Sequence, residues 1–127
     1  MIFIDTSFII ATVSKIDSWH ERAMELLPEV KKEERVISEL IISEVITLVG
    51  TLHGSKAAVN VYNYIKDNHT IYKDKKLLDE SIPIYSKYNG NLSLADSTAI
   101  AVMKELKIEK IASFDPNFDE KGVNRIY

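Results

Sequence analysis

Short apolar runs alternate with longer amphipathic stretches along the whole chain. The short runs fall at residues 1–4, 35–38, 70–72, 110–114 and 123–127, and each has the length of a β-strand. The first of them, MIFI, is apolar at all four positions, which is typical of a strand buried on both faces. Strands of this kind separated by helices predict a central parallel sheet, and hence an α/β fold with three α/β/α layers.

The stretches between these runs carry the patterns of helices. The expected helices begin near residues 6–7 and 18, and cover 38–53, 55–69, 75–90 and 92–107. Ser18 and Glu21 have the spacing of a capping box that would open the second helix. Gly54 is expected to end the third. Pro28 and Pro83 are expected to kink or divide the helices that contain them.

One acid falls among apolar positions in the helix expected at 38–53. At about 100° per residue, its apolar side chains share one sector that comprises Leu40, Ile41, Val45, Leu48, Val49 and Leu52. Glu44 projects inside this sector, close to its polar flank. Taken alone, Glu44 is best explained by a stem that packs on the core and a carboxylate that reaches water.

Composition narrows the class of protein. The 127 residues suit one domain spanning 1–127, with 46% hydrophobic residues and enough length to bury a core. The absence of cysteine excludes disulfides, thiolate zinc sites and a thiol nucleophile. A formal charge of −3 argues against sequence-blind coating of nucleic acid, although it leaves room for a local basic groove. No stretch has the pattern of a secretory signal or membrane span, so we expect a soluble, cytoplasmic protein.

Two acids directly follow predicted strands, and a third opens a predicted helix. Asp5 follows the first strand, Asp115 follows the strand at 110–114, and Asp96 lies in the first turn of the last helix. Each has a simple structural explanation: a helix cap for Asp5, a capping box with Ser93 for Asp96, and turn chemistry for Asp115. Ligands of parallel sheets, however, bind outside the carboxyl ends of the strands, where Asp5 and Asp115 are predicted to lie.

Bringing such acids together has an energetic cost that suggests a cation. Two like charges at 4 Å repel by about 4 kcal/mol at an effective dielectric constant of 20. A divalent cation offsets this repulsion, and all-oxygen ligands suit Mg²⁺ or Mn²⁺, which keep several waters. The joint placement of the acids therefore favours a metal site over a separate structural explanation for each acid.

The acids and their surrounding segments resemble a known family. The segments are MIFIDTS with Asp5, SELIISEVITL with Glu44, LADSTAIAVMKELKIEKI with Asp96, and ASFDPNFD with Asp115. In this order they resemble the PIN domain, and within it the VapC-type toxins of prokaryotic toxin–antitoxin pairs. The resemblance covers essentially the whole chain. It implies the same α/β/α sandwich and a ribonuclease activity that depends on Mg²⁺ or Mn²⁺.

The resemblance also assigns roles to residues and partners. It implies that Asp5, Glu44, Asp96 and Asp115 form the catalytic acidic group, and that Asp5, Asp96 and Asp115 hold the metal. The implied orienting hydroxyls belong to Thr6 or Ser7 and to Ser113, where the family often has threonine, and Asp119 is an additional acid with a looser match. The implied partners are an RNA substrate, a small antitoxin protein and a second copy of the chain in a homodimer.

Two alternatives stay open at this point. One is a PIN-domain nuclease that processes RNA without any antitoxin, and the other is a non-catalytic PIN-like module that binds protein or RNA. Repelling acids in the absence of catalysis would be hard to explain, which counts against the second. Scattered lysines and Arg125 are candidate phosphate contacts, but solvated faces explain each of them as well. The tyrosines at helical spacings are better explained by packing or dimer contacts than by base stacking.

Overall fold

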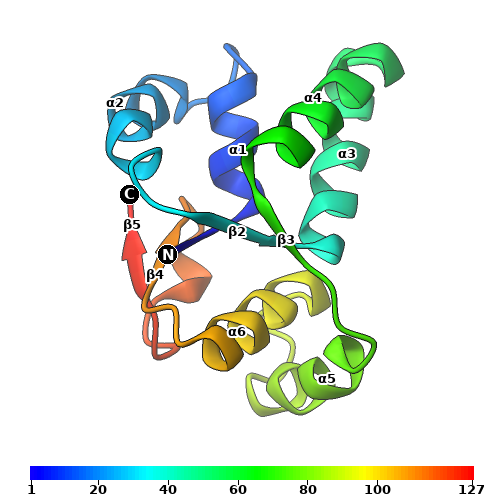
Figure 1. Cartoon of the computed structure of the whole chain (residues 1–127), viewed down its shortest axis with the longest axis vertical. Coiled ribbons are helices and arrows are strands. Elements are labelled where there is room, and N and C mark those ends of the chain that lie inside the picture. Colours follow the sequence, from blue (N-terminus) through cyan, green and yellow to red (C-terminus); the bar gives the residue numbers. More distant parts are fainter.

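The computed structural model describes residues 1–127 and contains a five-stranded, wholly parallel sheet with six α-helices (Figure 1). The strands are β1 (Ile2–Ile4), β2 (Arg35–Ser38), β3 (Thr70–Tyr72), β4 (Lys110–Ala112) and β5 (Asn124–Ile126). The helices are α1 (Thr6–Val13), α2 (His20–Val30), α3 (Glu39–His53), α4 (Ser55–Asn68), α5 (Leu77–Lys87) and α6 (Leu94–Leu106), followed by a 3₁₀ helix, η1 (Pro116–Phe118).

The elements form the three layers that the sequence predicts. Helices α1 to α4 lie on one side of the sheet, and α5 and α6 lie on the other (Figure 1). The central strand β1 is almost fully buried, with exposed fractions of 2% or less at Ile2, Phe3 and Ile4. Its continuous apolar run is therefore explained by neighbours on both faces. None of the helices is long and apolar enough to cross a membrane.

The strand order creates a crevice at one edge of the sheet. The order is β3-β2-β1-β4-β5, so the chain builds outward from β1 to β3 and then returns to place β4 beside β1. In register, Phe3 pairs with both Val36 on β2 and Ile111 on β4. Ligands of such sheets bind at the carboxyl ends of the two strands where the order reverses, here β1 and β4.

Local details depart from the sequence prediction at the start of α2. This helix begins at His20, and Trp19 occupies the cap position without a side-chain cap, so the capping box predicted for Ser18 and Glu21 is wrong. The side chain that binds a backbone amide at this turn is instead Asp17, whose Oδ1 accepts a 2.8 Å hydrogen bond from the Trp19 amide. The helix then runs through Pro28 to Val30, and α5 likewise continues through Pro83. Each proline removes one helical hydrogen bond without ending its helix.

The buried face of α3 also differs from the predicted sector. The buried side chains are Ile41, Ile42, Val45 and Val49. Leu48 and Leu52, which the helical projection placed in the core, are 42% and 50% exposed. The sector is rotated because α3 packs against α4 and α6 as well as the sheet. Glu44 is only half-buried as a result.

Candidate active site

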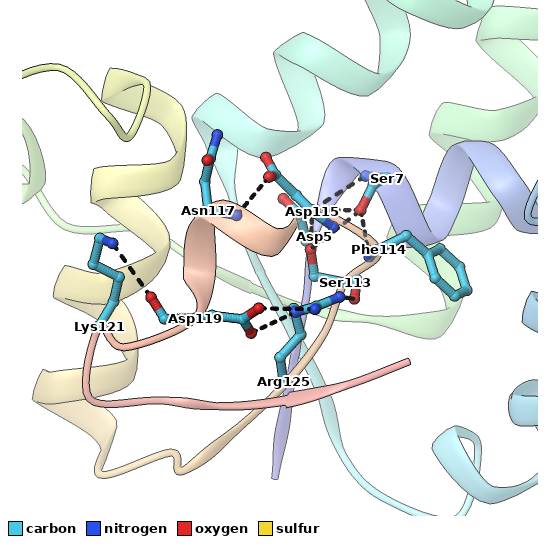
Figure 2. Close-up of polar contacts among 9 residues, drawn as sticks. All are labelled: Asp5, Ser7, Ser113, Phe114, Asp115, Asn117, Asp119, Lys121 and Arg125. Atoms are coloured by element: carbon cyan, nitrogen blue, oxygen red, sulfur yellow. Dashed lines mark hydrogen bonds and ion pairs between the residues drawn. The ribbon is translucent and has the colours of Figure 1, made fainter.

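Asp5 is held at the carboxyl end of β1 by hydroxyl groups from two distant segments. Its Oδ2 accepts hydrogen bonds from Ser7 Oγ at 2.7 Å and from Ser113 Oγ at 2.7 Å (Figure 2). The Ser7 amide adds a longer bond of 3.3 Å, which caps α1. The Asp5 amide donates to the carbonyl of Ala112 on β4, so the backbone is fixed as well. Asp5 is thereby oriented by the chain itself, in a position that is only 2% exposed.

The same two hydroxyls tie the segment after β4 to this carboxylate. Ser7 Oγ accepts a 2.9 Å hydrogen bond from the Phe114 amide, and Ser113 Oγ accepts one of 3.0 Å from the Asp115 amide. Asp115 Oδ1 in turn accepts from the Asn117 amide at 2.8 Å and opens η1 (Figure 2). Asp5 and Asp115 are thus positioned by one shared network.

Of the two candidate hydroxyls that follow Asp5, Ser7 makes the orienting contact. Thr6 is buried and its Oγ1 has no hydrogen-bond partner. Asp5 Oδ1 is likewise buried without a partner. An unsatisfied carboxylate oxygen in a buried position is costly, and a bound cation would satisfy it.

Asp96 comes to the site from the first turn of α6. The Ser93 hydroxyl caps this helix by accepting from the Asp96 amide at 3.0 Å, as the Ser93-x-x-Asp96 spacing predicts. Asp96 is only 8% exposed. Burial, followed by the negative charges of Asp5, Glu44 and Asp115, raises the pKa of Asp96 to about 7. Burial also raises the pKa of Asp5, against the opposing effect of its hydrogen bonds.

The four acids that the sequence singled out line one open cleft of about 540 Å³. Asp5 follows β1, Glu44 projects from α3, Asp96 begins α6 and Asp115 follows β4, so four separate elements converge there. The cleft lies at the reversal of strand order described above. None of its lining residues is Lys, Arg or His. The result is a strongly acidic concave surface.

Asp119 is not part of this group. Its carboxylate forms a two-point ion pair with Arg125, at 2.8 Å from Nε and 3.0 Å from Nη2 (Figure 2). This pairing lowers the pKa of Asp119. Arg125 also donates a long hydrogen bond of 3.4 Å to the carbonyl of Ser113. Arg125, one of the candidate phosphate contacts, is therefore occupied by contacts within the chain.

The arrangement fits a cation bound largely through water. No three His, Asp or Glu side chains lie close enough to form a ready-made metal cage. Mg²⁺ does not require one, since it is usually held by one or two carboxylates and keeps its other waters. The partnerless oxygen of Asp5 and the raised pKa of Asp96 both mark positions where a positive charge would be stabilising. Asp5, Asp96 and Asp115 are the residues that could hold it.

A second groove, of about 550 Å³, lies between α5, α6 and the segment that precedes β5. Its lining includes four lysines, Lys87, Lys104, Lys107 and Lys121, and a single carboxylate, Glu109. The apolar side chains of Ile84, Ile100, Met103 and Ile108 also line it. It therefore lacks the donor set for metal chemistry.

The chain matches one known family over nearly its full length. The sequence profile of the PIN domain matches residues 2–124. The chain belongs to the PIN domain family. No curated protein sequence matches it at a significant level.

Two solved structures share the fold of this PIN domain. Mycobacterium tuberculosis VapC20, described as a sarcin-ricin loop cleaving toxin, matches with a TM-score of 0.90 and 24% identity, over 99% of this chain and 98% of that one. FitAcB from Neisseria gonorrhoeae matches with a TM-score of 0.68 and 16% identity, over 100% and 97% of the respective chains. The match covers the sheet and the helices on both of its sides, so the whole sandwich in Figure 1 has the PIN-domain fold.

Several residues that line the cleft were not among the predicted site residues. They are Asp17, Trp19, Asn91 and Asn117. All four lie in loops or at helix starts, where no periodicity marks a side chain as facing a site. Two of them could have been found from their closeness in sequence to predicted site residues: Asn117 follows Asp115 by two residues, and Asn91 precedes the cap of α6.

Proposed function

We propose that this PIN domain is a metal-dependent endoribonuclease that acts as the toxin of a toxin–antitoxin pair. The observation that carries the proposal is the convergence of Asp5, Glu44, Asp96 and Asp115 on one cleft at the strand-order reversal. Membership of the PIN family and the shared fold with VapC20, which is described as a sarcin-ricin loop cleaving toxin, support the choice of substrate.

The cofactor that suits this site is Mg²⁺ or Mn²⁺, held by Asp5, Asp96 and Asp115. When bound, such a cation lowers the pKa of a water ligand and neutralises negative charge on the scissile phosphate. Asp5 would use the oxygen that has no protein partner, because its other oxygen is occupied by Ser7 and Ser113. Asp96 must lose its proton to act as a ligand, and its raised pKa makes this loss dependent on pH near neutrality.

The remaining residues prepare the site for hydrolysis. Glu44 faces the cleft from α3 and is assigned the role of orienting the attacking water. Ser7 and Ser113 keep Asp5 and Asp115 in fixed relative positions, so no reorganisation is needed when the substrate binds. Hydrolysis adds the water oxygen to phosphorus and breaks the bond from phosphorus to one ribose oxygen, which leaves with a proton.

The partners follow from the same proposal. A ribonuclease toxin acts on RNA in the cytoplasm and requires an antitoxin, a small protein that blocks it until needed. The homodimer is supported by exposed apolar side chains on α5, where Leu78, Ile82 and Tyr85 are each 42% exposed or more. Their spacing of four and three residues places them on one helix face.

The direct test is cleavage of total cellular RNA by the purified protein, with Mg²⁺, with Mn²⁺ and with EDTA. Cleavage should require the cation, and Asp96→Asn should abolish it in a protein that still folds. Asp119→Asn is the matched control, because Asp119 is paired with Arg125 outside the cleft. A well-folded Asp96→Asn variant with full activity would refute the site. Binding of RNA without any cleavage would instead favour the non-catalytic module.

The antitoxin is tested in cells. Expression of the chain alone should arrest growth, and co-expression of a short neighbouring reading frame should relieve the arrest. RNA cleavage in vitro without growth arrest would favour a processing nuclease that has no antitoxin.

A further inference from the structure

We propose that Trp19 is a stacking platform that holds one unpaired base of the RNA beside the catalytic acids. The inference rests on the proposed ribonuclease function and adds a residue that would contact the substrate. It is carried by a stack of three aromatic rings at the wall of the cleft.

The three rings run from the core to the cleft. Phe8 stacks on Phe114 with centroids 5.8 Å apart, and Phe114 stacks on Trp19 with centroids 4.7 Å apart and planes 11° from parallel. Phe8 and Phe114 are buried, at 2% and 5% exposure, whereas Trp19 is 44% exposed and lines the cleft. The stack therefore ends in an accessible indole that lies on the wall of the acidic cleft.

The stack is physically joined to the acids. Phe114 lies between Ser113, which holds Asp5, and Asp115, and its amide donates to Ser7 Oγ (Figure 2). A base placed on Trp19 would thus be positioned relative to the carboxylates through rigid, buried neighbours. A base held there would add its stacking energy to the binding of RNA in the cleft.

The backbone that carries Trp19 is also fixed. The Trp19 amide donates to Asp17 Oδ1 at 2.8 Å, and its carbonyl accepts from the Ala23 amide at 2.9 Å. The next residue, His20, donates from Nδ1 to the carbonyl of Ala11 at 2.6 Å, which ties the turn to α1. Little conformational freedom remains to be lost on binding, so the platform is preorganised.

The charge of the cleft explains why a stacking contact is needed. Its lining contains five carboxylates, from Asp5, Asp17, Glu44, Asp96 and Asp115, and no basic side chain, so it repels a phosphate backbone. Apart from the cation, attraction must come from contacts that do not depend on charge. Stacking of a base on an aromatic ring is such a contact, and it requires a base that has left its helical stack.

The alternative is that Trp19 only covers Phe114. Two substitutions separate the roles: Trp19→Phe keeps an aromatic face, and Trp19→Leu keeps an apolar cover without one. If Trp19 is a platform, the Leu variant should raise KM for RNA about 5- to 150-fold with kcat nearly unchanged, as loss of one stacked base predicts. The Phe variant should stay within a few-fold of the parent. Tyr62→Leu, which removes an exposed aromatic ring on α4 outside the cleft, is the control.

Trp19 is the only tryptophan in the chain, so its fluorescence reports directly on the proposed contact. The probe is single-stranded RNA of random sequence, about ten nucleotides long, added to the Asp96→Asn variant with Mg²⁺. We expect quenching by this RNA and not by the same length of double-stranded RNA.

Each outcome bears on the proposal in a defined way. Quenching together with a KM effect confined to Trp19→Leu supports the platform. If the parent cleaves RNA, but RNA does not quench the fluorescence and Trp19→Leu does not change KM, the platform is overturned and the ribonuclease function stands. A parent that neither binds nor cleaves RNA overturns the proposed function, and the platform falls with it. A Leu variant with a lowered melting temperature and reduced kcat but unchanged KM shows a structural cover only.

Discussion

The Ser113 hydroxyl donates a 2.7 Å hydrogen bond to the carboxylate of Asp5, a residue 108 positions earlier in the chain. The bond joins the ends of β1 and β4, two adjacent parallel strands. Because Ser113 also accepts from the amide of Asp115, one hydroxyl sets the relative positions of two acids. The chemistry of the cleft therefore depends on a contact between its two sides as much as on the acids themselves.

Removal of this hydroxyl should weaken both stability and activity. Ser113→Ala deprives a buried carboxylate of a donor and should lower the free energy of unfolding by about 1.5–3 kcal/mol, measured by urea denaturation. It should also reduce kcat, since Asp115 loses its anchor. Ser86→Ala, at an exposed serine on α5, is the control and should change neither quantity. A Ser113→Ala protein as stable and active as the parent would contradict the role given to the network.

Asp96→Asn should separate stability from function. The substitution removes a negative charge that burial and three other carboxylates disfavour. With a pKa of about 7, the ionised Asp96 carboxylate destabilises the folded state by at most about 4 kcal/mol at high pH. Without metal at about pH 8, the variant should unfold at a higher temperature than the parent. Cleavage should nevertheless fall by about 10²- to 10³-fold or more. A loss of stability under these conditions would argue that Asp96 has a stabilising partner in the fold.

The response to Mg²⁺ should grow with pH. In the unfolded chain Asp96 titrates near 3.8, whereas in the fold its pKa is about 7, so the folded state holds an extra proton between these values. Stability without metal should therefore decrease as pH rises through this window and level off above it. A cation displaces the proton, so the increase in melting temperature on adding Mg²⁺ should be small near about pH 5.5 and larger near about pH 8.5. An increment that does not change with pH would show that Asp96 is not a ligand.

Glu44→Gln should shift this pH dependence. The charge of Glu44 is one of the causes that raise the pKa of Asp96, so its removal should lower that pKa. The effect of Mg²⁺ on melting temperature should then appear at lower pH than in the parent. If Glu44 orients the attacking water, cleavage should also fall by about 10²-fold or more. A shifted metal response with full cleavage would restrict Glu44 to an electrostatic role.

Asp115→Asn and Asp119→Asn should behave differently although only four positions separate them. Asp115 lines the cleft, so its substitution should remove most of the cleavage activity and reduce the stabilisation by Mg²⁺. Asp119 is exposed and paired with Arg125, so its substitution should leave cleavage within about twofold of the parent. Rates of RNA cleavage at saturating Mg²⁺ provide the measurement. A loss of activity in Asp119→Asn equal to that in Asp115→Asn would place Asp119 in the site after all.

The sequence predicted the sheet well because its signal is local. A run such as MIFI is apolar at every position only where both faces are covered, and the structure confirms this burial for Ile2, Phe3 and Ile4. The position of Asp5 and Asp115 at one edge also followed, since carboxyl ends of parallel strands lie together. The capping of α6 by Ser93 depends on four consecutive residues and was predicted for the same reason.

Other features could not be read from the chain. The helical projection of α3 placed Leu48 and Leu52 in the core, but the packing of α3 on α4 and α6 rotates that face toward solvent. Periodicity defines the apolar sector of a helix, but it does not show how much of that sector the neighbouring helices and strands cover. The capping box predicted at Ser18 does not form, and the Trp19 amide donates to Asp17 Oδ1 instead.

By itself, then, the sequence determined the succession of strands and helices along the chain and the burial of the central strand, both of which follow from local pattern. It also predicted that Asp5 and Asp115 lie at one edge of the sheet, whereas the grouping of all four acids came from the resemblance to the PIN family. Only the tertiary structure decided that Ser7 rather than Thr6 orients Asp5. It also decided that Asp119 pairs with Arg125 outside the cleft, and that Trp19 lines the cleft. Each of these depends on the distance between side chains far apart in the sequence. Such distances result from how the helices and strands pack in the folded chain, and the periodicity of a single element does not encode them.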